Sequence, residues 1–100
     1  MNLKKYEAVF ILDIRKVDDE GEAFSKELAE LIKSLGGEML ESVSMGRKQF
    51  AREIKKRKAG VYWNYIFNLD AEQTDQLRTK FMLDERVLRQ LVIIYDRPEQ

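Results

Sequence analysis

The sequence predicts an α+β fold, one domain over residues 1–100, in which two helices cover one face of a four-stranded antiparallel sheet. Four stretches of the chain have the composition of strands and two carry apolar residues at helical spacing, in the order strand, helix, strand, strand, helix, strand. Of the 100 residues 44% are apolar, which is enough for one core. One proline and five glycines interrupt the chain, and no linker divides it.

The first strand is predicted over residues 6–13, where the side chains alternate between two faces. One face is wholly apolar and is expected to meet the core; it carries Tyr6, Ala8, Phe10 and Leu12. The other face is apolar only at its middle, at Val9 and Ile11.

An amphipathic helix is predicted next. Asp19 can cap its first turn, with Glu22 three residues later in the capping-box position. Apolar residues then recur at helical spacing, at Phe24, Leu28, Leu31, Ile32 and Leu35. The pair Gly36-Gly37 is expected to end the helix, because glycine tolerates the left-handed conformation found at helix C-termini.

Residues 38–54 carry sparser apolar residues, which predicts a long strand at a sheet edge, with Gly46 as a bulge or bend. Residues 55–60 are expected to form a turn. The third strand is predicted over residues 61–69, which are aromatic and β-branched. Its core side carries Val61, Trp63, Tyr65, Phe67 and Leu69, and its other side carries Tyr62, Asn64, Ile66 and Asn68.

Asp70 is a candidate N-cap for the second helix, which carries Leu77 and Phe81, and residues 87–95 form the last strand. This order predicts the ferredoxin-like βαββαβ topology, with the first and third strands at the centre. The face away from the helices then presents Val9, Ile11, Tyr62 and Ile66. An uncovered apolar patch of this kind indicates a protein partner.

The composition argues against catalysis. There is no histidine and no cysteine, so the commonest general base, metal ligand and thiol nucleophile are missing. No nucleophile elbow and no phosphate-cradling glycine loop occur. We therefore expect no catalytic residue, metal, cofactor or small-molecule substrate. The absence of cysteine permits a reducing compartment, and the cytoplasm is the default location. No apolar stretch approaches the roughly 18 residues of a membrane span, and no signal peptide is expected.

The charges are balanced in number but not in position. Lysine plus arginine equals aspartate plus glutamate at 18 each, yet seven of the basic residues fall between positions 47 and 58, against Glu53 alone. They are Arg47, Lys48, Arg52, Lys55, Lys56, Arg57 and Lys58. Such a basic hairpin can neutralise several phosphates, which favours nucleic-acid binding. The alternative is a solvated hairpin whose charges protect a sheet edge from aggregation.

Several segments together resemble one known family. They are Lys5-Tyr6-Glu7, Gly46-Arg47-Lys48-Gln49-Phe50-Ala51, Gly60-Val61-Tyr62 and Val87-Leu88-Arg89, one in each predicted strand. In this order and spacing the chain resembles bacterial small-subunit ribosomal protein S6. The resemblance implies a ferredoxin-like structural component of the small ribosomal subunit, which binds small-subunit rRNA together with ribosomal protein S18 in the cytoplasm and has no enzymatic role.

By position, the resemblance implies rRNA contacts at Arg47, Lys48 and Arg89. It assigns the open sheet face to the protein partner, through Val9, Ile11, Tyr62 and Ile66. With the basic hairpin included, the candidate rRNA-binding set is Arg47, Lys48, Arg52, Lys55, Lys56, Arg57, Lys58 and Arg89. Arg52 departs from the family, which commonly has an aromatic residue there, so a phosphate contact is expected at this position rather than base stacking.

Two other classes remain open. An RNA-recognition motif has the same order of elements and reads bases with aromatic residues on its open face. Here, however, Phe10 and Trp63 are expected on the core side. A small ferredoxin-like enzyme or regulator is the second class, since acylphosphatase-type sites use an arginine and an asparagine, for which Arg47 and Asn64 are the candidates. No matching loop motif surrounds them.

Overall fold

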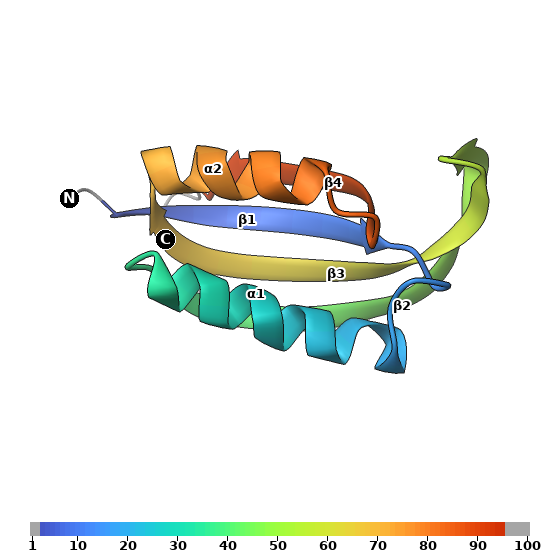
Figure 1. Ribbon diagram of the computed structural model, residues 1–100, viewed down its shortest axis with the longest axis horizontal. Coiled ribbons are helices and arrows are strands. Elements are labelled where there is room, and N and C mark those ends of the chain that lie inside the picture. Colours follow the sequence, from blue (N-terminus) through green and yellow to red (C-terminus); the bar gives the residue numbers. More distant parts are fainter. Residues whose placement is uncertain (1–2, 96–100) are drawn as a thin grey trace, which may run out of the picture.

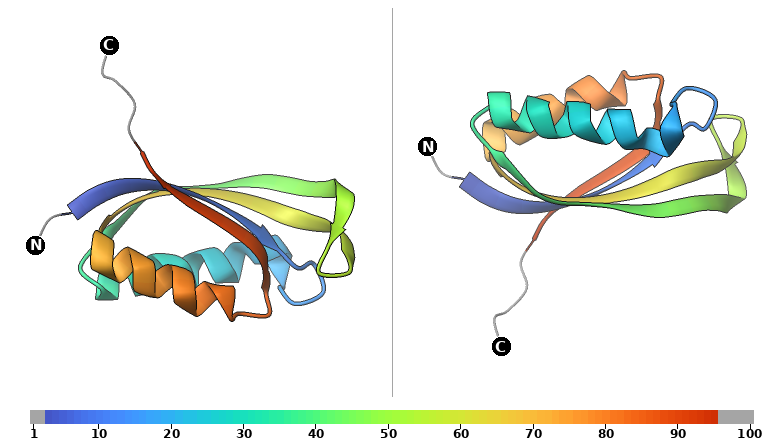
Figure 2. Two further views of the ribbon diagram at one scale, coloured as in Figure 1. Left: turned by 90° about the horizontal axis from the view of Figure 1, so that it is seen from above. Right: turned by 90° about the horizontal axis from the view of Figure 1, so that it is seen from below.

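The computed structural model describes residues 3–95. Its elements are β1 (Leu3–Leu12), the short 3-10 helix η1 (Asp19–Gly21), α1 (Glu22–Ser34), β2 (Glu38–Ile54), β3 (Arg57–Asp70), α2 (Ala71–Met82) and β4 (Val87–Ile94). The strands form one antiparallel sheet in the order β2-β3-β1-β4, and both α-helices pack on one face of it (Figures 1 and 2). This is the predicted ferredoxin-like topology, with β1 and β3 at the centre.

The core lies between the helices and the sheet. The predicted inward faces of β1 and β3 are buried, and Phe10, Tyr65 and Phe67 are completely inaccessible to solvent. The Phe10 ring packs edge-on or tilted against Phe24, Tyr65 and Phe81, with centroids 5.8, 5.5 and 5.6 Å away. The rings of Phe24 and Phe81 lie 5.4 Å apart. Such aromatic packing fixes both helices on the sheet. None of the helices within residues 3–95 has the length and apolar composition needed to cross a membrane.

The start of α1 differs from the prediction. The capping box of Asp19 and Glu22 does not form, because Asp19–Gly21 make η1 and α1 begins at Glu22. Asp19 still caps the first turn, as predicted, because its Oδ1 accepts from the Ala23 backbone N–H at 3.2 Å. Asp19, Glu20 and Gly21 all have left-handed backbone angles, with φ of 45°, 57° and 97°. Trp63 explains this path: its indole Nε1–H donates to the Glu20 carbonyl at 2.9 Å. The predicted end at Gly36 is confirmed, with φ of 91°.

The hairpin between β2 and β3 confirms one prediction and corrects another. The register of β2 against β3 shifts between Ser44 and Gly46, and Gly46 has φ of 80°, as expected of a bulge. The turn expected over residues 55–60 is wrong in length, because Ile54 pairs with Arg57 and only Lys55 and Lys56 connect the strands. Both lysines have positive φ, 49° and 66°, which a two-residue hairpin turn requires.

Candidate nucleic-acid interface

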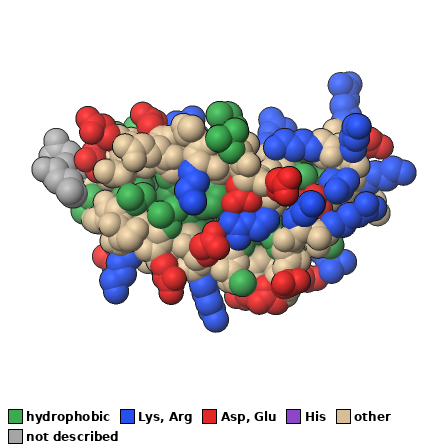
Figure 3. All heavy atoms as spheres, viewed as in Figure 1, with side chains coloured by type: hydrophobic (Ala, Val, Ile, Leu, Met, Phe, Trp, Pro, Cys, Tyr) green, Lys and Arg blue, Asp and Glu red, His purple; other side chains and the backbone are tan. Residues whose placement is uncertain are grey.

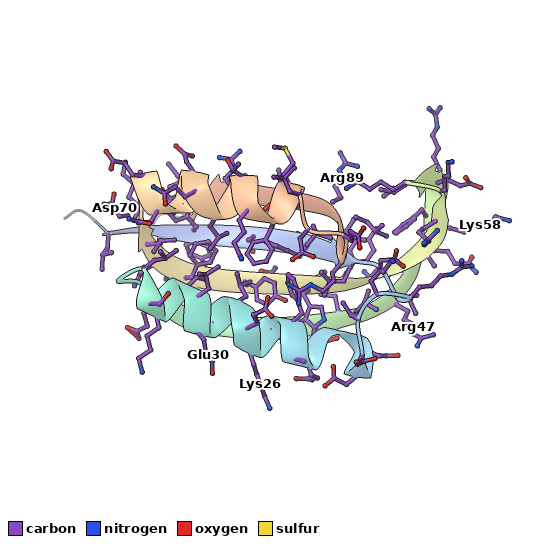
Figure 4. The ribbon with its side chains drawn as sticks, in the orientation of Figure 1. Lys26, Glu30, Arg47, Lys58, Asp70 and Arg89 are labelled. Carbon is purple, nitrogen blue, oxygen red and sulfur yellow. The ribbon has the colours of Figure 1, made fainter. Side chains whose placement is uncertain are left out.

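The basic hairpin projects from one end of the sheet and curls toward the side that carries the helices (Figure 2). Lysine and arginine side chains gather at this end of the molecule (Figure 3). Arg47, Lys58 and Arg89 all lie there, although they come from β2, β3 and β4 (Figure 4). The fold therefore adds Arg89 to the charge that the hairpin already concentrates.

Arg47 and Lys48 point to opposite faces of β2. Arg47 pairs with the core residue Val61 and so lies on the helix side, where its Nε donates to Glu20 Oε1 at 2.8 Å. Lys48 pairs with Gly60 on the open side, and its Nζ lies 5.5 Å from the centre of the Tyr62 ring. The two residues therefore serve two different surfaces of the same hairpin.

The tip of the hairpin is tied to the rest of the molecule. Arg57 Nε donates to both carboxylate oxygens of Asp13, at 3.1 and 3.2 Å, and only 3% of Asp13 is exposed. Lys55 Nζ donates to the Val87 carbonyl at 3.3 Å. These two residues anchor the hairpin to the end of β1 and the start of β4. The remaining cations of the hairpin, Arg52, Lys56 and Lys58, are exposed.

Arg89 lies on the open side of the sheet, opposite Ile11. It also lines, with Lys55, a groove of about 650 Å³ between β4 and α2, whose floor includes Phe81 and Leu88. The structure thus brings one hairpin lysine and Arg89 to the same groove, while Lys48 shares the open face with Arg89.

The open face is built from rows of residues that pair across the four strands. One row is Gly46, Tyr62, Ile11 and Arg89; the next is Val43, Asn64, Val9 and Leu91; the third is Glu41, Ile66, Glu7 and Ile93. Val9, Tyr62 and Ile66 are partly exposed, as predicted. The first row carries the cation Arg89 and the third carries the acids Glu41 and Glu7, so the charge of the open face changes from positive to negative along the strands.

Ile11 corrects the prediction, because it faces this side but is only 7% exposed. Gly60 of β3 and the Phe50 ring of β2 lie beside it. An added Cβ on Gly60 would lie 2.8 Å from Ile11 Cγ2 and 2.9 Å from Phe50 Cζ, so all three groups meet. The Phe50 and Tyr62 rings also pack at 6.2 Å. Ile11 therefore packs beneath the side chains of the open face and is not available to a partner.

Three exposed apolar residues of the open face were missed by the sequence prediction. They are Val43, Leu91 and Ile93, at 51%, 59% and 48% exposed. Because successive side chains of a strand alternate between the two faces, the sequence of β4 indicates that Leu91 and Ile93 share a face. Their position opposite Val9 and Glu7, however, depends on the register of the β1–β4 pair. With these residues included, the uncovered apolar patch extends over all four strands.

The structure disfavours both rival classes. Phe10 is fully buried and Trp63 is only 4% exposed, so neither can stack on a base. Arg47 lies on the helix side of the sheet, whereas Asn64 lies on the open side, where its Nδ2 donates to Glu7 Oε2 at 3.2 Å. They cannot share one phosphate in the acylphosphatase manner. Within residues 3–95, no group of three or more acidic side chains is placed to hold a metal ion.

Arg86 precedes β4, and its guanidinium is held by contacts within the molecule. It donates to Asp84 at 2.7 Å and to Glu27 at 2.6 Å, and its guanidinium lies 4.8 Å from the centre of the Phe24 ring. The hydrogen bonds from Arg86 lower the pKa of both carboxyl groups. Arg86 therefore joins α1 to the α2–β4 loop and is not part of the candidate phosphate-binding surface.

The comparisons with known proteins point to one family. The family described as ribosomal protein S6 matches residues 5–93. The small ribosomal subunit protein bS6 of Syntrophobacter fumaroxidans is 30% identical over 94% of this chain and 64% of its own length. The bS6 protein of Prochlorococcus marinus is 32% identical over 97% of this chain and 56% of its own length. The chain thus spans less than two thirds of these two relatives.

Another relative is covered more completely. The bS6 protein of Flavobacterium johnsoniae is 32% identical, over 95% of this chain and 84% of its own length. Among solved structures, the crystal structure of 30S ribosomal protein S6 from Thermotoga maritima superposes with a TM-score of 0.83 at 23% identity, covering 94% of this chain and 89% of the other. At that identity the superposition establishes a shared fold.

Proposed function

The chain belongs to the ribosomal protein S6 family, and on this premise we propose that it is a structural component of the bacterial small ribosomal subunit, binding small-subunit rRNA together with ribosomal protein S18. The family consists of structural rather than enzymatic proteins. Its members work in the ribosome, in the cytoplasm.

The observation that carries the RNA part of the proposal is the gathering of exposed cations at one end of a molecule of zero net charge (Figure 3). The contacts proposed for rRNA phosphates are Arg47, Lys48, Arg52, Lys56, Lys58 and Arg89, which are all exposed. Arg57 and Lys55 contribute charge but also hold the hairpin in place, through Asp13 and the Val87 carbonyl. Concentrated charge of this kind gives salt-dependent affinity for a phosphate backbone.

The open sheet face is proposed to bind S18. Its apolar side chains form a patch with polar residues at its borders, which is the usual composition of a protein interface. Val43, Leu91 and Ile93 are exposed, and Val9, Tyr62 and Ile66 are partly exposed. The row with Glu41 and Glu7 is acidic, so the part of the partner that meets it is expected to be basic. RNA and protein would then use adjacent surfaces that share Lys48 and Arg89.

The test of the RNA part is the salt dependence of binding. The protein and S18 are titrated onto a small-subunit rRNA transcript at several salt concentrations. If all six proposed side chains meet phosphates, log affinity is expected to fall with log salt at a slope of roughly −4 to −5. Replacing Arg47, Lys48 and Arg52 together by alanine is expected to reduce that slope to about −2 to −3 and to leave the fold intact, because exposed charges change stability by less than about 0.5 kcal/mol each.

A charge-matched control separates the hairpin from the net charge. Lys4, Lys26 and Lys33 are exposed and lie outside the hairpin, so their replacement by alanine removes the same three charges elsewhere. This control is expected to keep the slope of the unmodified protein. A flat salt response of the unmodified complex, or an equal loss in both triple variants, would refute the proposed RNA surface.

A further inference from the structure

Arg47 is held by one edge of its guanidinium. Its Nε donates to Glu20 Oε1 at 2.8 Å, while its terminal amino groups donate no hydrogen bond to residues 3–95. The side chains of Arg47 and Glu20 are 57% and 54% exposed. A guanidinium fixed in this way presents two N–H donors in a fork, which is the geometry that binds phosphate bidentately.

Glu20 is itself held in place by a strained turn. Asp19 and Glu20 have φ of 45° and 57°, a left-handed conformation that aspartate adopts more readily than most residues and that is uncommon for glutamate. Gly21 follows with φ of 97°, and an added Cβ there would lie 2.7 Å from Trp63 Nε1 and 2.8 Å from Leu12 Cδ1. The indole of Trp63 donates to the Glu20 carbonyl at 2.9 Å. The buried core thus fixes the position of the Glu20 backbone.

Stability does not account for a glutamate at this position. An ion pair between two half-exposed side chains contributes little to the free energy of folding. The bond to Trp63 uses only the backbone carbonyl, so glycine or asparagine would form it with less strain. What the glutamate adds is a carboxylate directed at Arg47. Strain that stability does not explain is often associated with function.

We propose that Glu20 is a positioning residue for RNA binding, which orients Arg47 so that its two free amino groups face an rRNA phosphate. The inference rests on the proposed function, because it assigns a second residue to the same RNA surface. It also gives an acidic residue a favourable role at a site that binds an anion. The gain arises because the Arg47 side chain loses less freedom on binding when it is already ordered.

The test compares Glu20→Ala with Glu20→Gln in complexes with S18 and a small-subunit rRNA transcript. Alanine removes the acceptor of the Arg47 Nε–H bond, so Arg47 must be ordered on binding. The affinity for rRNA is expected to fall by about 3- to 10-fold. Glutamine keeps an acceptor for Nε–H, so its affinity is expected to lie within about twofold of the unmodified protein or above it. Trp63 fluorescence is measured in both variants and should be unchanged if the turn is intact.

Glu30→Ala is the control for removing a negative charge, because Glu30 is exposed on α1 away from the hairpin (Figure 4). It is expected to leave RNA affinity unchanged or slightly raised. The inference is wrong if Glu20→Ala binds as tightly as the unmodified protein, and binding tighter than that would make Glu20 a competitor for Arg47. It is also wrong if Glu20→Gln loses as much affinity as Glu20→Ala.

Arg47→Ala separates failure of this inference from failure of the proposed function. If the unmodified complex binds rRNA and Arg47→Ala weakens that binding, the proposed RNA surface is supported, whatever the results for the Glu20 variants. If Glu20→Ala has no additional effect in the Arg47→Ala background, Glu20 acts through Arg47, as proposed. If the unmodified complex does not bind rRNA at all, the proposed function itself is wrong.

Discussion

Arg57 shows how the same residue type can serve different purposes within one basic run. In the sequence it is one of four consecutive cations, residues 55–58, and nothing distinguishes it from its neighbours. In the structure it pairs with Asp13, 44 residues away, and 28% of its side chain is exposed against 5% for Asp13. A sequence pattern can find the charge, but the partner depends on how the hairpin curls over the end of β1.

Arg57→Ala is expected to lower the free energy of unfolding by about 2–3 kcal/mol. The buried carboxylate of Asp13 would lose its counter-charge, and the backbone N–H of Arg15 would be its remaining hydrogen-bond donor. Urea denaturation measures the effect. The matched control is Lys58→Ala, which removes an exposed cation next to it and is expected to cost less than about 0.5 kcal/mol. Equal costs for the two variants would contradict a structural role for Arg57.

At the scale of elements, the strands and helices are well predicted where hydrophobic periodicity determines the secondary structure. They are less well predicted where a single turn determines where an element begins or ends. The inward faces of β1 and β3 were predictable because every second residue is apolar. The hairpin turn was not, because Lys55-Lys56 carries no glycine or asparagine, the usual residues of a two-residue turn with positive φ. Likewise, Asp19 matches the pattern of a helix cap, but the bond from Trp63 to Glu20 sets a different start for α1.

The hairpin turn is therefore expected to be a place where sequence changes increase stability. Replacing Lys55 by asparagine and Lys56 by glycine should raise the free energy of unfolding by about 1 kcal/mol, because both residues tolerate positive φ. The relief of strain at two positions, about 1 kcal/mol each, outweighs the loss of the bond from Lys55 Nζ to the Val87 carbonyl, which contributes about 1 kcal/mol. The midpoint of urea denaturation reports it. Lys58→Gly is the control, since Lys58 lies within β3, where glycine is expected to cost about 0.5–1 kcal/mol. If the turn variant is less stable than the unmodified protein, the strain at the two lysines is smaller than the contribution of the Lys55 bond.

The same turn variant is expected to bind rRNA less strongly, because it lacks two cations. If both lysines meet phosphates, the slope of log affinity against log salt should become shallower by roughly 1.4–1.8. Stability and RNA affinity would then change in opposite directions. That result would explain why lysines occupy a turn that favours other residues. An unchanged slope would show that Lys55 and Lys56 lie outside the RNA surface.

The contact of α1 with the α2–β4 loop makes stability depend on pH through Arg86. Its hydrogen bonds lower the pKa of Glu27 and Asp84 below their ordinary values of 4.5 and 3.8. Since these groups bind protons more weakly in the folded chain, their contribution is complete above the ordinary values and is lost as pH falls through the lowered ones. Arg86→Met is expected to lower the free energy of unfolding at pH 7 by about 1–2 kcal/mol.

The pH profile distinguishes the ion pairs from the packing of Arg86 on Phe24. Methionine keeps apolar contact with the ring, so the loss in Arg86→Met should shrink as the pH falls below about 4, where the carboxylates become protonated. Urea denaturation at pH 7, 5 and 3 measures it. Lys16→Met is the control, because Lys16 forms only an exposed pair with Glu85 at 4.0 Å. A loss that is the same at all three pH values would assign the effect to packing.

At the scale of the whole molecule, the topology was predictable and the composition of the open face was only partly so. Val9, Tyr62 and Ile66 follow from alternation on the central strands. The edge strands contribute Val43, Leu91 and Ile93, and placing them requires the register of each strand pair, which the bulges at Ser44/Gly46 and Ile11/Leu12 shift. A one-residue shift moves every side chain to the other face, so alternation alone cannot assign these strands.

The edge strand β4 therefore provides the sharpest test of the proposed S18 surface. Leu91 and Ile93 are 59% and 48% exposed, so replacing both by aspartate should leave the core intact and place two charges within the patch. S18 binding, measured by calorimetry without RNA, is expected to weaken at least about 30-fold, since desolvating charges at an interface centre costs more than about 2 kcal/mol. Met82 and Leu83 are equally exposed aliphatic residues at the end of α2, at 64% and 78%. Their double aspartate variant should bind S18 normally, and equal weakening in both variants would place the partner elsewhere.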